Sequence, residues 1–234
     1  MTDSIRDSLV EHVLSTRDAE RDIFDALDPD VRDRPMRPGD WSPKDHQAHL
    51  TAWKERQADR YEAIRNGREP LVDEREDDEI NAELHARTAD WPWDEVVRQS
   101  DEVSERLASE IAATDEATLA ANERLVAGTF GNGPFHAITH FGWLADAGVA
   151  LDEARLAAFL DGQEHMLRTA TLPDRDRGTG FYNLACAHAL AGRLDRARPL
   201  LRDAFAMRPD VAEFAREDPD LVALRDELAS LAGG

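Results

Sequence analysis

The feature that most restricts how this 234-residue chain can fold is a series of long stretches in which apolar residues recur every three or four positions. This spacing places the apolar side chains along one face of a helix. It predicts four long helices, over residues 4–27, 42–66, 93–113 and 134–148. Four amphipathic helices, with one long connection between the second and the third, predict an all-α fold built on a four-helix bundle.

The two longest connections between these helices are predicted to differ in structure. The acidic connection, residues 68–92, is expected to carry a short helix through Ile80 and Leu84. Its run of Asp and Glu at residues 73–79 is interpreted as a solvated face rather than a cation site. Residues 114–133 are rich in Thr, Asn and Gly, and we expect them to form a loop.

The second helix has clear start and stop signals. Ser42 is a good N-cap, Pro43 occupies the first helical position, and Asp45 completes a capping-box pattern. The sequence Asn66-Gly67 is a typical helix end. Pro134 similarly occupies the first position of the predicted fourth helix.

Histidines follow both of these helix starts. His136 and His140 are four positions apart in the fourth helix and therefore project from one face. His46 and His49 lie in the first turns of the second helix. If the two helices pack together in the bundle, imidazoles from both could converge on one divalent metal ion. His12, beside the apolar stripe of the first helix, is expected to be partly exposed rather than a ligand.

Charge and composition argue against several classes of function. The formal net charge is -21, which argues against binding of nucleic acid or of an anionic membrane surface, because phosphate binding needs clustered Lys and Arg. No apolar run approaches the roughly 18 residues needed to cross a bilayer. The first residues lack the basic and apolar regions of a signal peptide, so we expect a cytoplasmic protein. Cys186 is the one cysteine, which excludes an internal disulfide and a thiolate zinc site, and we expect it to pack in the core.

A second domain is predicted after residue 147, so that the chain would consist of residues 1–147 and 148–234. Residues 178–210 resemble a tetratricopeptide repeat, in which small residues let two helices approach and a proline ends the second. The residues that fit the spacing of this repeat are Leu184, Ala185, His188, Gly192, Ala197, Leu201, Ala204 and Pro209. Helices predicted over 151–169 and 218–231 would cover its apolar faces. The resemblance implies a protein or peptide partner, with His165 and His188 as packing residues.

The first 147 residues contain three short motifs, WSPKD at 41–45, AHLTAW at 48–53 and EIN at 79–81, in addition to the histidine pair at 136 and 140. With these motifs the segment resembles the DinB-like superfamily of four-helix-bundle metalloproteins. It is most similar to the DfsB-type branch, which is associated with colibactin self-resistance. That branch commonly has a tyrosine after its first fourth-helix histidine, where this chain has Ala137.

The resemblance implies a metal site of three histidines, one from the second helix and two from the fourth. By position these are His49, His136 and His140, which leaves His46 outside the site. Three neutral imidazoles suit zinc or nickel, with manganese or iron as further options, and they leave positions open for water or substrate. A bound water has its pKa lowered towards neutrality, and superfamily thiol transferases bind a thiol there instead. Members often dimerise, so we expect a homodimer.

Two functions remain open at this point. The first is a metal-dependent enzyme that detoxifies a small electrophilic metabolite by hydrolysis or by conjugation to a thiol. The second is a non-catalytic binding or sequestration protein, whose repeat-like domain mediates protein–protein interaction. No catalytic base is assigned, because Asp45 is interpreted as a helix cap and Glu55 as a surface group.

Overall fold

The computed structural model of the protein describes residues 4–37, 40–170 and 172–233. Within these ranges the regular elements are helices, and no β-strand occurs. This confirms the all-α prediction. The chain divides into two compact units, with the division between Pro134 and Phe135.

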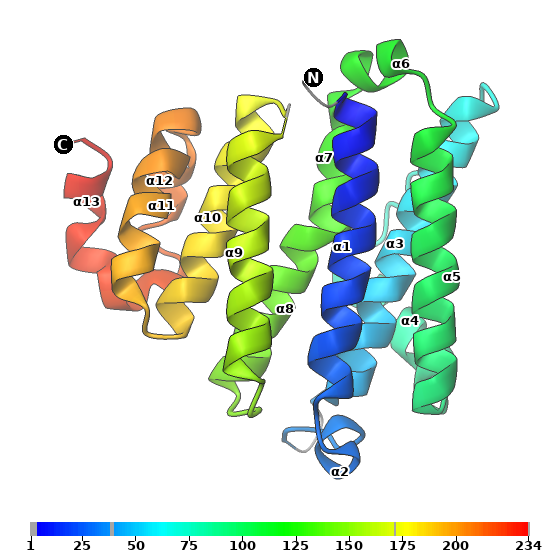
Figure 1. Cartoon of the computed structure of the whole chain (residues 1–234), viewed down its shortest axis with the longest axis horizontal. Coiled ribbons are helices and arrows are strands. Elements are labelled where there is room, and N and C mark those ends of the chain that lie inside the picture. Colours follow the sequence, from blue (N-terminus) through cyan, green and yellow to red (C-terminus); the bar gives the residue numbers. More distant parts are fainter. Residues whose placement is uncertain (1–3, 38–39, 171, 234) are drawn as a thin grey trace. The chain divides into compact units, whose positions relative to one another are not determined.

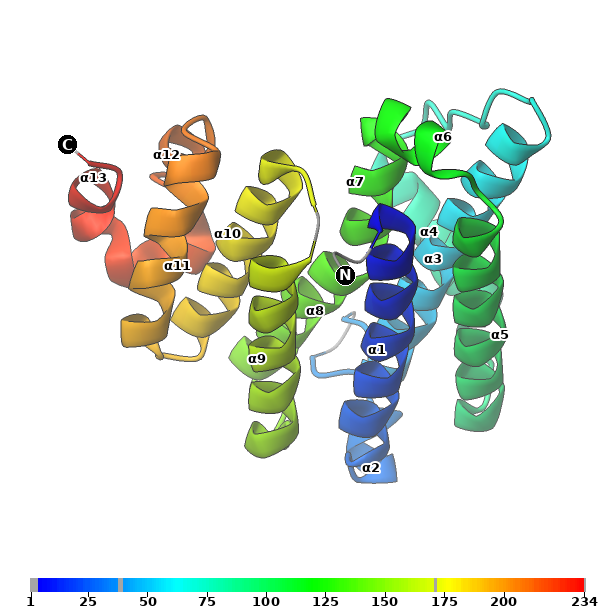
Figure 2. The same ribbon diagram turned by 45° about the horizontal axis from the view of Figure 1, so that its top comes forward.

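The first unit is built on four helices, of which α3 is central. α3 packs against α1, α5 and α7, and α1 also packs against α5 (Figures 1 and 2). Shorter helices close the ends and sides of this arrangement. The elements are α1 (Ile5–Asp25), α2 (Pro29–Arg32), α3 (Pro43–Arg65), α4 (Asp77–Thr88), α5 (Trp93–Ala112), α6 (Glu116–Ala121) and α7 (Glu123–Asn132).

The predicted start and end of α3 are confirmed. The Asp45 carboxylate accepts a hydrogen bond from the Ser42 N–H at 2.8 Å, and the Ser42 hydroxyl oxygen accepts one from the Asp45 N–H at 3.2 Å. These two bonds form a capping box, which satisfies N–H groups that the first helical turn leaves without partners. α3 ends at Asn66, after which Gly67 takes a φ of 66° that favours glycine.

The predicted loop over residues 114–133 is wrong, because this segment forms α6 and α7. Two of the polar residues that suggested a loop are helix caps. The Asp115 side chain accepts a hydrogen bond from the Thr118 N–H, and the Asn122 side chain accepts one from the Leu125 N–H. Both residue types are favoured at N-caps because they can bond the free N–H groups of a first turn.

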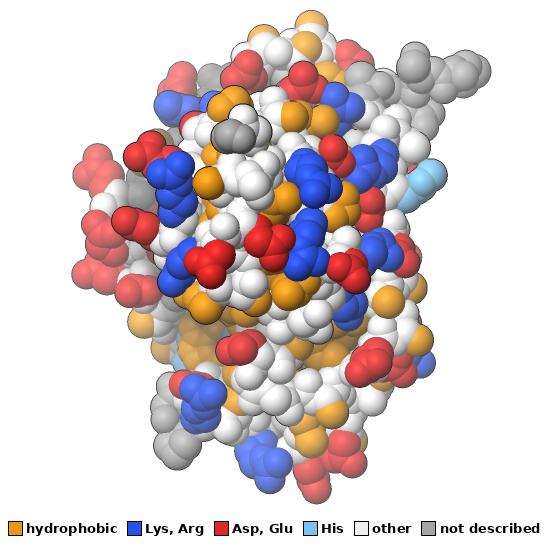
Figure 3. Space-filling model, turned by 90° about the vertical axis from the view of Figure 1, so that its left-hand side faces the viewer, with side chains coloured by type: hydrophobic (Ala, Val, Ile, Leu, Met, Phe, Trp, Pro, Cys, Tyr) orange, Lys and Arg blue, Asp and Glu red, His pale blue; other side chains and the backbone are white. Residues whose placement is uncertain are grey.

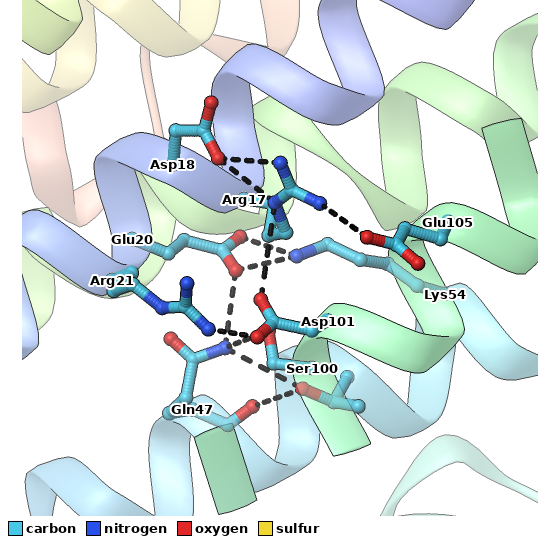
Figure 4. Close-up of polar contacts among 10 residues, drawn as sticks. Arg17, Asp18, Glu20, Arg21, Gln47, Lys54, Ser100, Asp101 and Glu105 are labelled. Atoms are coloured by element: carbon cyan, nitrogen blue, oxygen red, sulfur yellow. Dashed lines mark hydrogen bonds and ion pairs between the residues drawn. The ribbon is translucent and has the colours of Figure 1, made fainter. Parts of the chain in front are cut away.

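A buried ion pair joins α1 to α3 inside the first unit (Figure 4). The Lys54 ammonium donates to both carboxylate oxygens of Glu20, at 2.6 and 2.5 Å, and both side chains are at most 1% exposed. The Gln47 amide donates to Glu20 at 3.1 Å and to the Ser100 hydroxyl of α5 at 3.2 Å. The network therefore connects α1, α3 and α5.

Removing one partner of this pair is expected to destabilise the protein strongly, because the other charge would stay buried without compensation. Lys54→Met should lower the free energy of unfolding by about 3–5 kcal/mol. The measurement is urea denaturation followed by circular dichroism.

A matched control is Arg98→Gln, which removes an exposed ion pair with Glu95 and Glu102 on α5 and should cost at most about 1 kcal/mol. Equal losses in the two variants would contradict the role assigned to the buried pair. The double variant Glu20→Leu/Lys54→Met, which leaves no lone charge, should recover most of the stability.

The second unit contains the remaining helices, with α10 at its centre. α10 packs against α9, α11 and the 3₁₀ helix η1, and α9, α10 and α11 lie side by side in Figures 1 and 2. The predicted final helix, residues 218–231, is mostly the 3₁₀ helix. The elements are α8 (Pro134–Asp146), α9 (Glu153–Thr169), α10 (Asp174–Leu190), α11 (Leu194–Met207), α12 (Val211–Phe214), η1 (Pro219–Glu227) and α13 (Leu228–Leu231).

Glycines allow α8 and α10 to approach closely within the second unit. A Cβ at Gly180 of α10 would lie 2.6 Å from the ring of Phe135, and one at Gly142 of α8 would lie 3.1 Å from Leu190. α8 also contacts α9 through the rings of Phe141 and Phe159, whose centroids are 5.5 Å apart. The position of the histidine-bearing helix α8 in this unit therefore depends on small residues.

Gly180→Ala is expected to destabilise the protein by about 1–3 kcal/mol, because the added methyl group overpacks a filled contact. The control is Gly162→Ala in α9, where a Cβ would meet nothing within 4 Å and alanine should stabilise the helix by about 0.5–1 kcal/mol. Thermal unfolding of both variants measures the difference. A melting temperature for Gly180→Ala at or above that of the unmodified protein would contradict the close approach.

α10 and α11 form an antiparallel hairpin whose turn is centred on Gly192, with a φ of 71°. Figure 3 views the side on which α11 and α13 lie, and it shows acidic and basic side chains interleaved over this surface. Ion pairs also connect elements of this unit, since Arg198 of α11 donates to both carboxylate oxygens of Glu227 in η1 at 2.7 and 2.9 Å.

Among the residues that the structure describes, no helix combines the length and the apolar character needed to cross a membrane.

Candidate metal centre

His49 lies in the second turn of α3 and is enclosed by aromatic rings of the first unit. Its side chain is buried, with 7% of the residue exposed. The ring of Trp41 lies 4.9 Å from the imidazole, and the ring of Trp53, one turn later in α3, lies 6.2 Å from it. These contacts restrict the orientation of the imidazole, as a metal ligand requires.

A second layer of contacts holds Trp41 in place. The His85 ring of α4 stacks on Trp41 with a centroid distance of 5.4 Å and an interplanar angle of 8°. The His85 Nε2 also lies 3.7 Å from the Asp45 carboxylate. α4, which the sequence predicted only as a short helix, therefore supplies part of the wall beside His49.

The motif residues around His49 have identifiable structural roles. The Lys44 ammonium donates to the carbonyl oxygens of Ala89 and Trp91, at 3.1 and 2.9 Å, and so anchors the connection from α4 to α5. The Trp53 indole N–H donates to the Asn81 side chain at 3.0 Å. Together with the capping box, these bonds fix the start of α3 against α4.

The other two predicted ligands lie one turn apart in α8, as their spacing predicted. The rings of His136 and His140 are 4.7 Å apart with an interplanar angle of 70°. His140 is buried, whereas His136 is half-buried. The ring of Trp143, which is 47% exposed, lies 4.9 Å from His140.

His49, His136 and His140 are the three histidines that the resemblance implies as ligands, and each has a ring nitrogen that could bind a metal ion. Three neutral nitrogen donors are a suitable ligand set for a borderline divalent ion, and they leave at least one coordination position open. The donor set therefore fits a metal ion.

His46 lies outside this group, as expected. It is buried, and its ring meets that of Trp41 edge-on at 5.7 Å. Burial lowers the pKa of His46 to about 4, against the opposing effect of the Asp45 and Asp40 charges. His46 is therefore neutral near pH 7.

The expectation for His12 is wrong, because this residue is fully buried. Its imidazole packs edge-on against the ring of Phe130 at 4.7 Å. Phe130 belongs to α7, in a segment predicted to be a loop, so no sequence pattern indicated the ring that packs on His12.

The two histidines of the second unit differ from each other. His165 is exposed, so the prediction that it packs is wrong. His188 is buried, as predicted, and its Nδ1 accepts a hydrogen bond from the Arg193 Nε at 3.0 Å. Burial, assisted by the charge of Arg193, lowers the pKa of His188 to about 4.

The acidic residues nearest to His49 in sequence have structural partners. Asp45 serves the capping box, and Glu55 pairs with Arg87 of α4 at 3.0 Å. Both agree with the interpretation of these residues as a cap and a surface group.

A second group of possible ligand atoms, which no sequence motif indicates, is formed by Cys186, Asp218 and Asp220 in the second unit. The Tyr182 hydroxyl donates to Asp218 at 2.5 Å, and the same Asp218 carboxyl group caps η1 by accepting from the Asp220 N–H. Burial, followed by the nearby carboxylates, raises the pKa of the Cys186 thiol, which disfavours the thiolate that a metal would need. Cys186 is a buried core residue, as predicted, and the group is best explained as packing around a helix cap.

Comparison with known proteins identifies one match. The family model described as the DinB superfamily matches residues 13–146, which is more than half of the chain. The match includes His49, His136 and His140 and all three of the motifs found in the sequence. No curated protein and no solved structure matches the chain.

Proposed function

The chain belongs to the DinB superfamily, and we propose on this basis that it is a divalent-metal-dependent enzyme whose metal ligands are His49, His136 and His140. The observation that carries the proposal is the pair of His136 and His140 on one face of α8, whose ring centroids are 4.7 Å apart. The aromatic rings around His49 support it, because they fix the imidazole of one ligand before any metal binds.

We propose zinc or nickel as the metal, with manganese or iron as alternatives, since neutral imidazoles favour borderline ions. A metal held by three histidines supplies Lewis acidity at its open position. The residues of the chain would bind the substrate, and Trp41 and Trp53 offer apolar surface beside His49. This favours a small electrophilic molecule with apolar parts, consumed by hydrolysis or by conjugation to a thiol, as the similarity to the DfsB-type branch suggests.

The metal content of protein purified without an affinity tag tests the ligand set. Inductively coupled plasma mass spectrometry should find about one divalent ion per chain, and His49→Ala, His136→Ala and His140→Ala should each lower the occupancy by at least about tenfold. His165→Ala is the control, because His165 is exposed and is not one of the three proposed ligands, and this variant should retain the metal. Retention of metal in all three ligand variants would contradict the proposal.

Turnover distinguishes an enzyme from a binding protein. With p-nitrophenyl acetate as a probe of hydrolysis, and 1-chloro-2,4-dinitrobenzene plus a small thiol as a probe of conjugation, an enzyme should accelerate one reaction by at least about 100-fold over buffer. Removal of the metal, or His49→Ala, should abolish the acceleration. Binding of either probe without acceleration would favour the alternative, a sequestration protein.

The alternative function has one supporting observation. Asp45 and Glu55 are already engaged with other groups, so neither is available as a general base without a change of partner. A protein that binds a small electrophile in an aromatic pocket and does not turn it over would need no base.

We further propose that residues 148–234 form a tetratricopeptide-like domain that binds a peptide or a second protein. The hairpin of α10 and α11 supports this, because a Cβ at Gly178 of α10 would lie 3.0 Å from Met207 of α11 and Pro209 follows the second helix. The end of the family match at residue 146 supports a boundary near residue 147, whereas the compact units divide between Pro134 and Phe135 and place α8 with the later helices. A cytoplasmic location and a homodimer complete the proposal.

A further inference from the structure

A pocket of about 780 Å³ lies in the first unit, beside the second half of α3. Its walls come from α3, from the connection before α4, and from the starts of α4 and α7. This volume falls in the range that commonly holds small organic ligands. Because these residues all belong to the first unit, the pocket is defined without reference to the second.

The charges in this pocket oppose the charge of the whole chain. Four arginines line it, against three carboxylates, in a protein with a formal net charge of -21. The arginines are Arg56, Arg60, Arg68 and Arg124, and the carboxylates are those of Glu69, Asp73 and Asp77. Asp73 is already engaged, since it accepts from Arg56 at 3.1 Å and also binds Arg75.

Arg60 and Arg124 differ from the other arginines of the pocket. In the part of the chain that the structure describes, neither of them forms an ion pair with a carboxylate. Arg60 is half-buried, and it donates to the Gln57 side chain at 3.1 Å, which fixes its guanidinium. Burial and the neighbouring charge of Arg56 lower the pKa of Arg60. A half-buried cation without an anion is unfavourable, and a bound anion would remove the cost.

Two further features favour an anion at this place. The Nε–H of Arg56 is buried and, among the described residues, has no acceptor. Arg124 lies in the first turn of α7, whose N-terminus carries partial positive charge. The pocket therefore offers donors and positive charge from two helices.

The apolar part of the pocket indicates an organic ligand rather than an inorganic ion. Trp53, Ile64, Ile80 and Leu125 contribute to its walls. The Arg56 guanidinium lies over the Trp53 ring at 5.3 Å, which holds both side chains in place. A ligand with an aromatic or aliphatic body and one anionic group matches these walls.

From these observations we infer that the pocket binds a small organic anion, with its carboxylate or phosphate between Arg60 and Arg124 and its apolar body against Trp53. Trp53 also borders His49, at a ring distance of 6.2 Å. The anion would be the tail of a substrate or thiol cosubstrate of the metal centre. This assignment rests on the proposed function, whereas binding of the anion to the pocket does not.

Calorimetric titration of the full chain with four probes of similar shape tests the inference. Benzoate and phenyl phosphate are the anions, benzamide is the neutral counterpart, and benzylamine is the cation. One or both anions should bind at concentrations up to about 10 mM, at least about tenfold more tightly than benzamide or benzylamine. The tighter of the two anions identifies the headgroup, and raising the salt concentration should weaken it.

Substitutions locate the binding. Arg60→Gln and Arg124→Gln should each weaken anion binding by at least about fivefold. Arg65→Gln is the matched control, because Arg65 lies on the same helix, pairs with Glu110 and does not line the pocket, and it should bind as the unmodified protein does. Equal binding of benzamide and benzoate, no binding of either anion, or unchanged affinity in both arginine variants would overturn the inference.

His49→Ala separates this inference from the proposed function. The variant should lose metal and still bind the anion with unchanged affinity. If the unmodified protein binds the anion but no metal, only the proposed metal centre is contradicted. If the unmodified protein binds metal through the three histidines but does not bind the anion, only the inference about the pocket is contradicted.

Discussion

The first unit depends on one buried electrostatic interaction, the ion pair between Glu20 of α1 and Lys54 of α3. Placing two charges where neither meets water is costly unless each is well paired and hydrogen-bonded. Here the ammonium reaches both carboxylate oxygens, and Gln47 adds a third bond to the same carboxylate. The need to keep this pair closed fixes the register of α1 against α3. It thereby fixes the helix that carries His49.

Residues of the short sequence motifs hold His49 and its surroundings in place. Trp41 packs on the imidazole, Lys44 anchors the connection to α5, and Trp53 is held by Asn81. The roles of these three residues are structural, and none of them requires the residue to take part in a reaction. Each restricts the freedom of the ligand or of the wall beside it, which is how protein sites usually achieve the orientation that metal binding needs.

Local signals in the sequence predicted the elements that depend on local chemistry. The capping box at Ser42 and Asp45, the helix end at Gly67 and the one-turn spacing of His136 and His140 all appear as expected. The same reasoning failed for α6 and α7, because Asp115 and Asn122 are equally common in loops and at helix starts. His12 was misjudged for the same reason, since the ring that buries it belongs to α7.

Properties that depend on distant partners were not predictable from one sequence. Glu20 and Lys54 are far apart in the chain, and nothing near either residue indicates that both are buried. The positive pocket is similar, because Arg60 and Arg124 come together only when α7 packs against α3. The proposed ligand set was chosen in a different way. The resemblance to a family supplied the pairing of His49 with His136 and His140 that spacing alone left open.

The metal centre is tested most directly by X-ray diffraction from crystals of the untagged protein, measured on both sides of the absorption edge of the metal found in it. The account predicts one strong anomalous peak within about 2.3 Å of a ring nitrogen of each of His49, His136 and His140. A peak at Cys186 and Asp218 instead, or no peak among the three histidines of metal-containing protein, would contradict it.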